Sequence, residues 1–232
     1  DALWDDMTRH YSYFHLKQVN PKELAKRYRP QAVKAKSVRE FLDVLGEMLS
    51  ELRDGHVWIE YAGEQLPTYR TRTKPPNINL SATLAALENV QRFGEFAVVG
   101  TTKPEGFAAL VILRQSTADQ ASVDRVVEFI EAMKDAPGFL MDLRLANGGN
   151  ESLAQEIARR FCEKDAVYAR SKYRNGPRPS DFGPSQSRVL RAVEDAYTKP
   201  VVCVLGPGCV SSGEGWAKKM YCLPQMTTVG CA

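Results

Sequence analysis

Ser211 lies at the expected start of a helix, shortly after a segment that we expect to form a buried strand. The continuous apolar run 201–205 passes through Gly206-Pro207-Gly208 into the segment Ser211-Ser212-Gly213-Glu214. Backbone N–H groups and the helix dipole at such a position can stabilise a developing oxyanion. The same letters also fit a capping box, S-x-x-E, ahead of a core helix, and both interpretations can hold together.

A glycine pair, Gly148-Gly149, follows the strand expected at 138–143 and precedes a helix that Asn150 can cap. Glycines let the backbone turn sharply and present N–H groups to a ligand. A turn that merely joins a strand to a helix explains the same residues. Because the spacings G-x-G-x-x-G and G-x-x-x-x-G-K-[ST] are both missing, nucleotide binding is weakly supported.

His56 follows Asp54-Gly55, where a helical segment gives way to alternating residues. Histidine has an unperturbed pKa of about 6.5, which suits a proton acceptor at neutral pH. His10 and His15 lie among aromatic residues, and we expect them to pack or to face solvent. His56 is therefore the candidate base, although an exposed turn histidine would give the same pattern.

The composition narrows the classes of function. The chain has 232 residues, of which 44% are hydrophobic and 25% are charged, and a net charge of +3 without a stripe of Lys or Arg. Nucleic acid is therefore a poor candidate partner. No apolar stretch approaches the roughly 20 residues of a membrane span. The cysteines form no C-x-x-C pair and have no nearby histidine, so a structural zinc or another metal site is not expected; they are Cys162, Cys203, Cys209, Cys222 and Cys231.

The periodicity changes along the chain. Helical spacing dominates the first 55 or so residues, where Ser37 and Glu40 form a capping box. Beyond a Pro-, Thr- and Arg-rich stretch, strands and helices alternate, which predicts an α/β core with helices on a mostly parallel sheet. The expected helices are 3–14, 21–28, 38–52, 123–133, 151–162 and one from Ser212, and the expected strands are 56–61, 96–100, 107–113, 138–143, 201–205 and 227–230.

Three motifs occur in order: Leu-x-Asp-Gly-His at 52–56, Asp-Leu-Arg-x-x-Asn-Gly-Gly at 142–149, and the Ser-x-x-Glu helix at 211–214 with a closing Val229-Gly230. Together they resemble the tail-specific or C-terminal-processing serine peptidases, most closely the tricorn-like branch. The resemblance implies a crotonase/ClpP-like core of repeated strand-strand-helix units after an N-terminal helical region. It divides the chain into a helical region at 1–62, a connecting loop at 63–77 that is too short for a PDZ domain, and a catalytic core at 78–232.

The resemblance also implies roles. Ser211 matches the nucleophile, the backbone N–H of Ser212 matches half of the oxyanion hole, and Gly148 or Gly149 matches the loop that supplies the other half. His56 falls where tricorn-like members keep their general base. Members with a Ser/Lys dyad use a lysine roughly 25 residues beyond the serine, which would fall past the end of this chain. Tricorn-like members place a serine beside the histidine and an acid far downstream, whereas Gly55 precedes His56 here and no downstream acid is seen.

The expected activity is that of a serine endopeptidase acting on peptides or unfolded proteins, without a cofactor. The sequence does not fix the location: the resemblance favours a periplasmic or secreted one, and a cytoplasmic one stays open. The chain stops where such peptidases continue with further strands, so we expect an incomplete core that hydrolyses peptides poorly. Two alternatives use the same fold: a non-catalytic ligand-binding protein of the retinoid-binding kind, and a crotonase-type acyl-CoA enzyme. Fold alone does not decide among them.

Overall fold

A computed structural model describes residues 1–69 and 74–230. Residues 70–73 of the expected connecting loop, and Cys231, lie outside the described residues. The chain divides into two compact units, the first made of 1–72 with 172–185 and the second of 73–171 with 186–232. The hairpin segment 172–185 thus belongs to the first unit, although it is inserted between two strands of the second.

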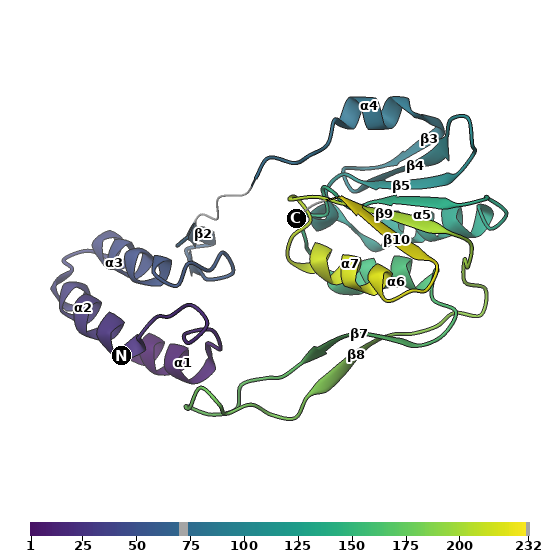
Figure 1. Cartoon of the computed structure of the whole chain (residues 1–232). Helices are drawn as coiled ribbons and strands as arrows, with labels where there is room; N and C mark the ends of the chain where they lie inside the picture. Colours follow the sequence, from purple (N-terminus) through teal and green to yellow (C-terminus); the bar gives the residue numbers. More distant parts are fainter. Residues whose placement is uncertain (70–73, 231–232) are drawn as a thin grey trace. The chain divides into compact units, whose positions relative to one another are not determined.

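The first unit is mainly helical (Figure 1). It contains α1 (Ala2–His10), α2 (Pro21–Lys34), α3 (Val38–Ser50) and an antiparallel hairpin of β1 (Trp58–Tyr61) and β2 (Glu64–Pro67). The predicted capping box is confirmed, because Ser37 Oγ accepts from the N–H of Glu40 at 3.1 Å. The helices bury one small apolar cluster; its members are Phe14, Leu24, Tyr28, Met48, Leu49 and Leu52.

Three expectations for this unit were wrong in detail. The first helix ends at His10 rather than Phe14, because the backbone of Tyr11 is extended. The side-chain hydroxyl of Tyr11 donates to the carboxylate of Asp54. The second helix continues through Pro30 to Lys34, since a proline removes one helical hydrogen bond without preventing the next turn. Residues 64–67, expected in a loop, pair with β1.

The second unit is built on a six-stranded sheet with the order β10-β9-β6-β5-β4-β3. The pairs from β10 to β5 are parallel, and β4 and β3 are added antiparallel, which makes the sheet mixed. A separate antiparallel pair joins β7 and β8. The strands are β3 (Leu87–Phe93), β4 (Ala97–Thr102), β5 (Ala108–Ile112), β6 (Phe139–Asp142), β7 (Ala166–Ser171), β8 (Gln186–Leu190), β9 (Val201–Leu205) and β10 (Met226–Gly230).

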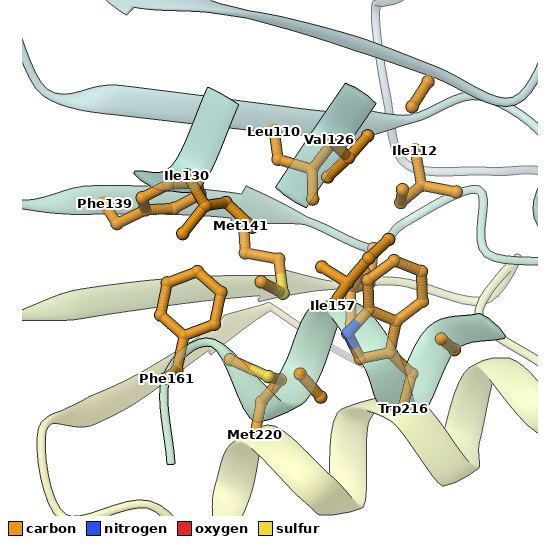
Figure 2. Packing of buried hydrophobic residues seen from close by; sticks show 14 of the residues in the cluster. Leu110, Ile112, Val126, Ile130, Phe139, Met141, Ile157, Phe161, Trp216 and Met220 are labelled. Carbon is orange, nitrogen blue, oxygen red and sulfur yellow. The ribbon is translucent and has the colours of Figure 1, made fainter. Parts of the chain in front are cut away.

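Alternate residues of the central strands face opposite layers. Leu110 and Ile112 of β5 join the large core under three helices, whereas Ala109 and Val111 face the short helix α4 (Leu80–Ala85). Figure 2 shows Ile157 and Trp216 meeting the sheet residues from α6 and α7. The three helices of the large core are α5 (Gln120–Ala132), α6 (Glu151–Arg159) and α7 (Ser212–Tyr221).

The architecture confirms the expected α/β fold with a helical N-terminal region. Strand 201–205 and the helix from Ser212 have the expected positions. The elements α4 and β3, and the pairing of β7 with β8, were not expected. In the described residues no helix is long and apolar enough to cross a membrane.

Candidate active site

Ser211 is the N-cap of α7, at the end of the turn that follows β9. Its backbone has φ 56° and ψ −125°. A side chain rarely adopts a positive φ because its Cβ crowds the neighbouring backbone. Such strain persists only where the surrounding structure enforces it, and it is frequent at functional sites. Ser211 is exposed, so the strained turn presents its hydroxyl at the surface.

The glycine loop packs directly against this turn. Gly148 has φ +91°, and a Cβ added there would lie 2.8 Å from Ser211 Cβ and 3.3 Å from Ser211 Oγ. Gly149 has φ +126°, and a Cβ there would lie 2.9 Å from Ser116 Cα. Both positions therefore require glycine for conformation and for space.

Hydrogen bonds hold the glycine loop and the turn before α7 together. The N–H of Val210 donates to the carbonyl of Ala146 at 3.1 Å. The hydroxyl of Ser212 crosses between the loops and donates to the carbonyl of Gly149 at 2.7 Å. The structure thus brings together four of the five residues singled out in the sequence: Ser211, Ser212, Gly148 and Gly149.

This arrangement leaves backbone donors beside the Ser211 hydroxyl. The first N–H groups of a helix have no intrahelical acceptor. Across the described ranges no backbone carbonyl accepts from the N–H of Ser212, Gly148 or Gly149. The start of α7 also carries positive partial charge from the aligned peptide dipoles. Chemically, the site can stabilise negative charge that develops on an oxygen next to Ser211.

His56 belongs to the first unit, in the turn after α3. Its side chain is 72% exposed, and its Nδ1 lies 3.7 Å from Oδ1 of Asp54. Because Ser211 belongs to the other unit, the pairing of His56 with Ser211 stays a prediction.

Asp54 is an acid that the sequence analysis missed. Its carboxylate is 14% exposed and accepts from the backbone N–H of His56 at 3.0 Å and from the hydroxyl of Tyr11 at 2.8 Å. Burial by itself would raise the pKa of Asp54, but these hydrogen bonds outweigh it and lower the pKa. Asp54 is therefore ionised at neutral pH. The spacing Asp-Gly-His was a usable signal, since an Asp side chain often accepts from the N–H two residues on.

An ion pair with one fully buried partner joins α6 to α7. Lys219 of α7 is fully buried, and its Nζ lies 2.5 Å from Oε1 of Glu151, the first residue of α6. Arg188 and the hydroxyl of Tyr168 also bond this carboxylate. Burial by itself would raise the pKa of Glu151, but the hydrogen bonds from Lys219 and Arg188 lower it to about 2. The pair ties the helix after the glycine loop to the helix that Ser211 caps.

The Asp-Leu-Arg part of the second motif has a structural place. Arg144 pairs with the buried carboxylate of Asp142 at 2.5 Å. The same guanidinium donates to the carbonyl of Asn77 and to the hydroxyl of Thr83, which attaches the start of α4 to the end of β6. The described part of the chain contains no group of three His, Cys, Asp or Glu side chains arranged to hold a metal ion.

Comparisons with known proteins identify the family of this chain and structures that share its fold. The profile of the tricorn protease C1 domain matches residues 1–50, and the profile of peptidase family S41 matches residues 108–231, more than half of the chain. None of the curated protein sequences matches at a significant level.

Solved structures share the fold. A candidate peptidase of Parabacteroides merdae is 21% identical with a TM-score of 0.82, and the match covers 98% of this chain and 72% of that one. The photosystem II D1 C-terminal processing protease is 14% identical with a TM-score of 0.51, covering 98% and 78%. Mature CPAF, solved with lactacystin, is 7% identical with a TM-score of 0.61, covering 98% and 82%.

Proposed function

Because this chain belongs to peptidase family S41, and so to the peptidase hydrolases, we propose that it cleaves peptide bonds as a serine peptidase through an acyl-enzyme on Ser211. One observation carries the proposal: Gly148 packs against Ser211 at the strained N-cap of α7. A strained turn between a strand and a helix, with backbone donors beside its serine, is a recurrent setting for a nucleophilic hydroxyl.

In the proposed mechanism His56 accepts the proton of Ser211 Oγ while that oxygen attacks the peptide carbonyl carbon. The carbonyl oxygen becomes an oxyanion, which accepts from the N–H of Ser212 and from the N–H of Gly148 or Gly149. A single such donor contributes about 3 to 4 kcal/mol to lowering the barrier. His56 then gives the proton to the leaving amine. A water molecule, deprotonated by His56, hydrolyses the ester and frees Ser211.

Asp54 has the orienting role in this proposal. An anionic carboxylate near Nδ1 of His56 favours the tautomer that carries its proton on Nδ1. That tautomer leaves Nε2 to accept the serine proton. The separation of 3.7 Å between Nδ1 and Asp54 Oδ1 is longer than a hydrogen bond, but catalytic contacts often tighten only when substrate is bound.

The proposed substrates are peptides or unfolded proteins, cleaved internally. Family membership supports this class, and the name of one similar structure, a C-terminal processing protease, describes the same chemistry in that protein. The site needs no cofactor for the steps above, because the nucleophile, the base and the donors are all groups of the chain.

The test is covalent labelling of the full-length gene product with a fluorophosphonate probe, whose phosphorus is attacked by an activated serine with loss of fluoride. We expect labelling at Ser211, loss of labelling in Ser211→Ala, and loss of hydrolysis of an unfolded protein in the same variant. Ser152→Ala is the matched control, because Ser152 is an exposed serine near a helix start. Hydrolysis that survives Ser211→Ala would exclude the mechanism, and absence of labelling and hydrolysis in the unaltered protein would favour the ligand-binding alternative.

A further inference from the structure

We propose that Gln115 is a positioning residue for the oxyanion hole, acting through the hydroxyl of Ser212 on the carbonyl of Gly149. The inference rests on the proposed function and adds to it a side-chain relay that fixes the distance between the two donor loops. Its residues come from three separate segments: the turn after β5, the glycine loop and the start of α7.

Gln115 begins a single 3₁₀ turn, Gln115–Thr117, and is only 1% exposed. Its Nε2 donates to Ser212 Oγ at 3.2 Å. Its Oε1 is buried and has no hydrogen-bond partner among the described residues. A buried acceptor left in this state destabilises the fold. Fold stability alone would favour an apolar side chain at position 115. We therefore explain the amide by the hydrogen bond that its Nε2 donates to Ser212 Oγ.

The donor end holds the hydroxyl of Ser212. That hydroxyl accepts from Gln115 and itself donates to the carbonyl of Gly149 at 2.7 Å. With one bond on each side, the hydroxyl is fixed in rotation as well as position. The relay therefore joins the segment that carries the Ser212 N–H to the loop that carries the N–H groups of Gly148 and Gly149.

Ser116, the next residue of the same turn, makes further hydrogen bonds to the glycine loop. The N–H of Ser116 donates to Asn147 Oδ1, and Asn147 Nδ2 donates to Ser116 Oγ, both at 3.0 Å. Gly149 packs against the Ser116 backbone. The turn 115–117 thus contacts the glycine loop through Ser116 and the start of α7 through Gln115. These contacts fix the distance between the glycine loop and the start of α7.

These contacts matter because glycine has the least restrained backbone of all residues. Two consecutive glycines with positive φ would sample several conformations without outside contacts, and misplacement of a catalytic group by about 1 Å can reduce the rate about 100-fold. A positioning relay improves transition-state stabilisation more than ground-state binding, so its loss should lower kcat and leave KM nearly unchanged.

The experiment is a double-mutant cycle with Gln115→Met and Ser212→Ala in the full-length gene product. Methionine keeps the length of the side chain without its amide, and alanine at 212 keeps the backbone N–H. We expect each single variant to lower kcat about 10- to 100-fold with KM within about twofold. The double variant should be no slower than Ser212→Ala, because Gln115 acts only through that hydroxyl.

Thermal unfolding separates positioning from a structural role. Gln115→Met removes the unpartnered acceptor, so we expect its melting temperature to be unchanged or higher while kcat falls. Gln91→Met, at an exposed glutamine of β3, is the control and should alter neither quantity. If Gln115→Met does not fold, Ser212→Ala alone still decides, because full kcat in that variant overturns the proposal. Unchanged kcat in both single variants, or additive losses in the double variant, would overturn it too. Failure of Ser211 labelling in the unaltered protein would instead count against the proposed function.

Discussion

Replacing Gly148 by alanine should abolish most of the catalytic rate while leaving the protein folded. The added Cβ would lie 2.8 Å from Ser211 Cβ and 3.2 Å from the carbonyl oxygen of Val210. Ordinary contacts begin at 3.4 Å, so the two loops must separate by about 0.6 Å. The residue also has φ +91°, a conformation that costs an L-residue about 1 to 2 kcal/mol.

These numbers separate the expected effects. Backbone strain and crowding together should reduce the free energy of unfolding by about 2 kcal/mol, a loss that a folded domain of 5 to 15 kcal/mol tolerates. The displacement falls on the nucleophile and on one oxyanion donor at once. Loss of one such donor costs about 10²- to 10³-fold in kcat, so we expect at least a 100-fold reduction.

The assay compares kcat, KM and urea unfolding of Gly148→Ala with those of Gly106→Ala. Gly106 also has a positive φ, +69°, but a Cβ there would meet nothing within 4 Å. Gly106→Ala should therefore show a similar strain cost in stability and a normal kcat. Near-normal kcat in Gly148→Ala, or equal losses of kcat in both variants, would refute the reasoning that links the glycine loop to Ser211.

Two further predictions concern the carboxylates of Asp54 and Glu151. Asp54→Asn should lower kcat by up to about 10⁴-fold, the loss seen when a serine peptidase of the chymotrypsin type loses its orienting carboxylate, and an unchanged kcat measured from pH 5 to 9 would remove Asp54 from the mechanism. The pKa of Glu151 is lowered to about 2 by its cationic partners, so its ionised form stabilises the fold above pH 4.5 and this contribution is lost as the pH falls toward 2. Glu151→Gln should cost about 3 to 5 kcal/mol at pH 7, because it leaves the fully buried ammonium of Lys219 without its anionic partner. The substitution should also flatten the fall of stability between pH 4.5 and 2, and urea unfolding that shows the same acid slope in both proteins would contradict this.

Local patterns in the sequence determined much of the fold. Helical periodicity and the capping residue Ser37 placed α3, since these signals act within four residues. The start of α7 was also expected correctly, but the capping-box interpretation of 211–214 was wrong, because the Ser211 side chain makes no capping hydrogen bond. A continuous apolar run placed β9, because a strand buried on both faces has no polar alternation. The strand β3 was missed because most of its side chains are exposed and polar, and nothing local distinguishes such an edge strand from a loop.

The sequence also located Ser211 and the glycine pair, because each depends on a local backbone feature. Ser211 precedes a helix start, and the two glycines have positive φ. The contacts around them were decided by tertiary structure. Gln115 lies 97 positions from Ser212, and Lys219 lies 68 positions from Glu151, so no spacing rule links them. A glutamine in a turn and a lysine late in a helix have no motif of their own. Each acquires its partner only when α5, α6 and α7 pack on one face of the sheet and bring distant segments within hydrogen-bond distance. Close packing fixes the positions of side chains in space, whereas local sequence preference fixes only the backbone conformation of a segment.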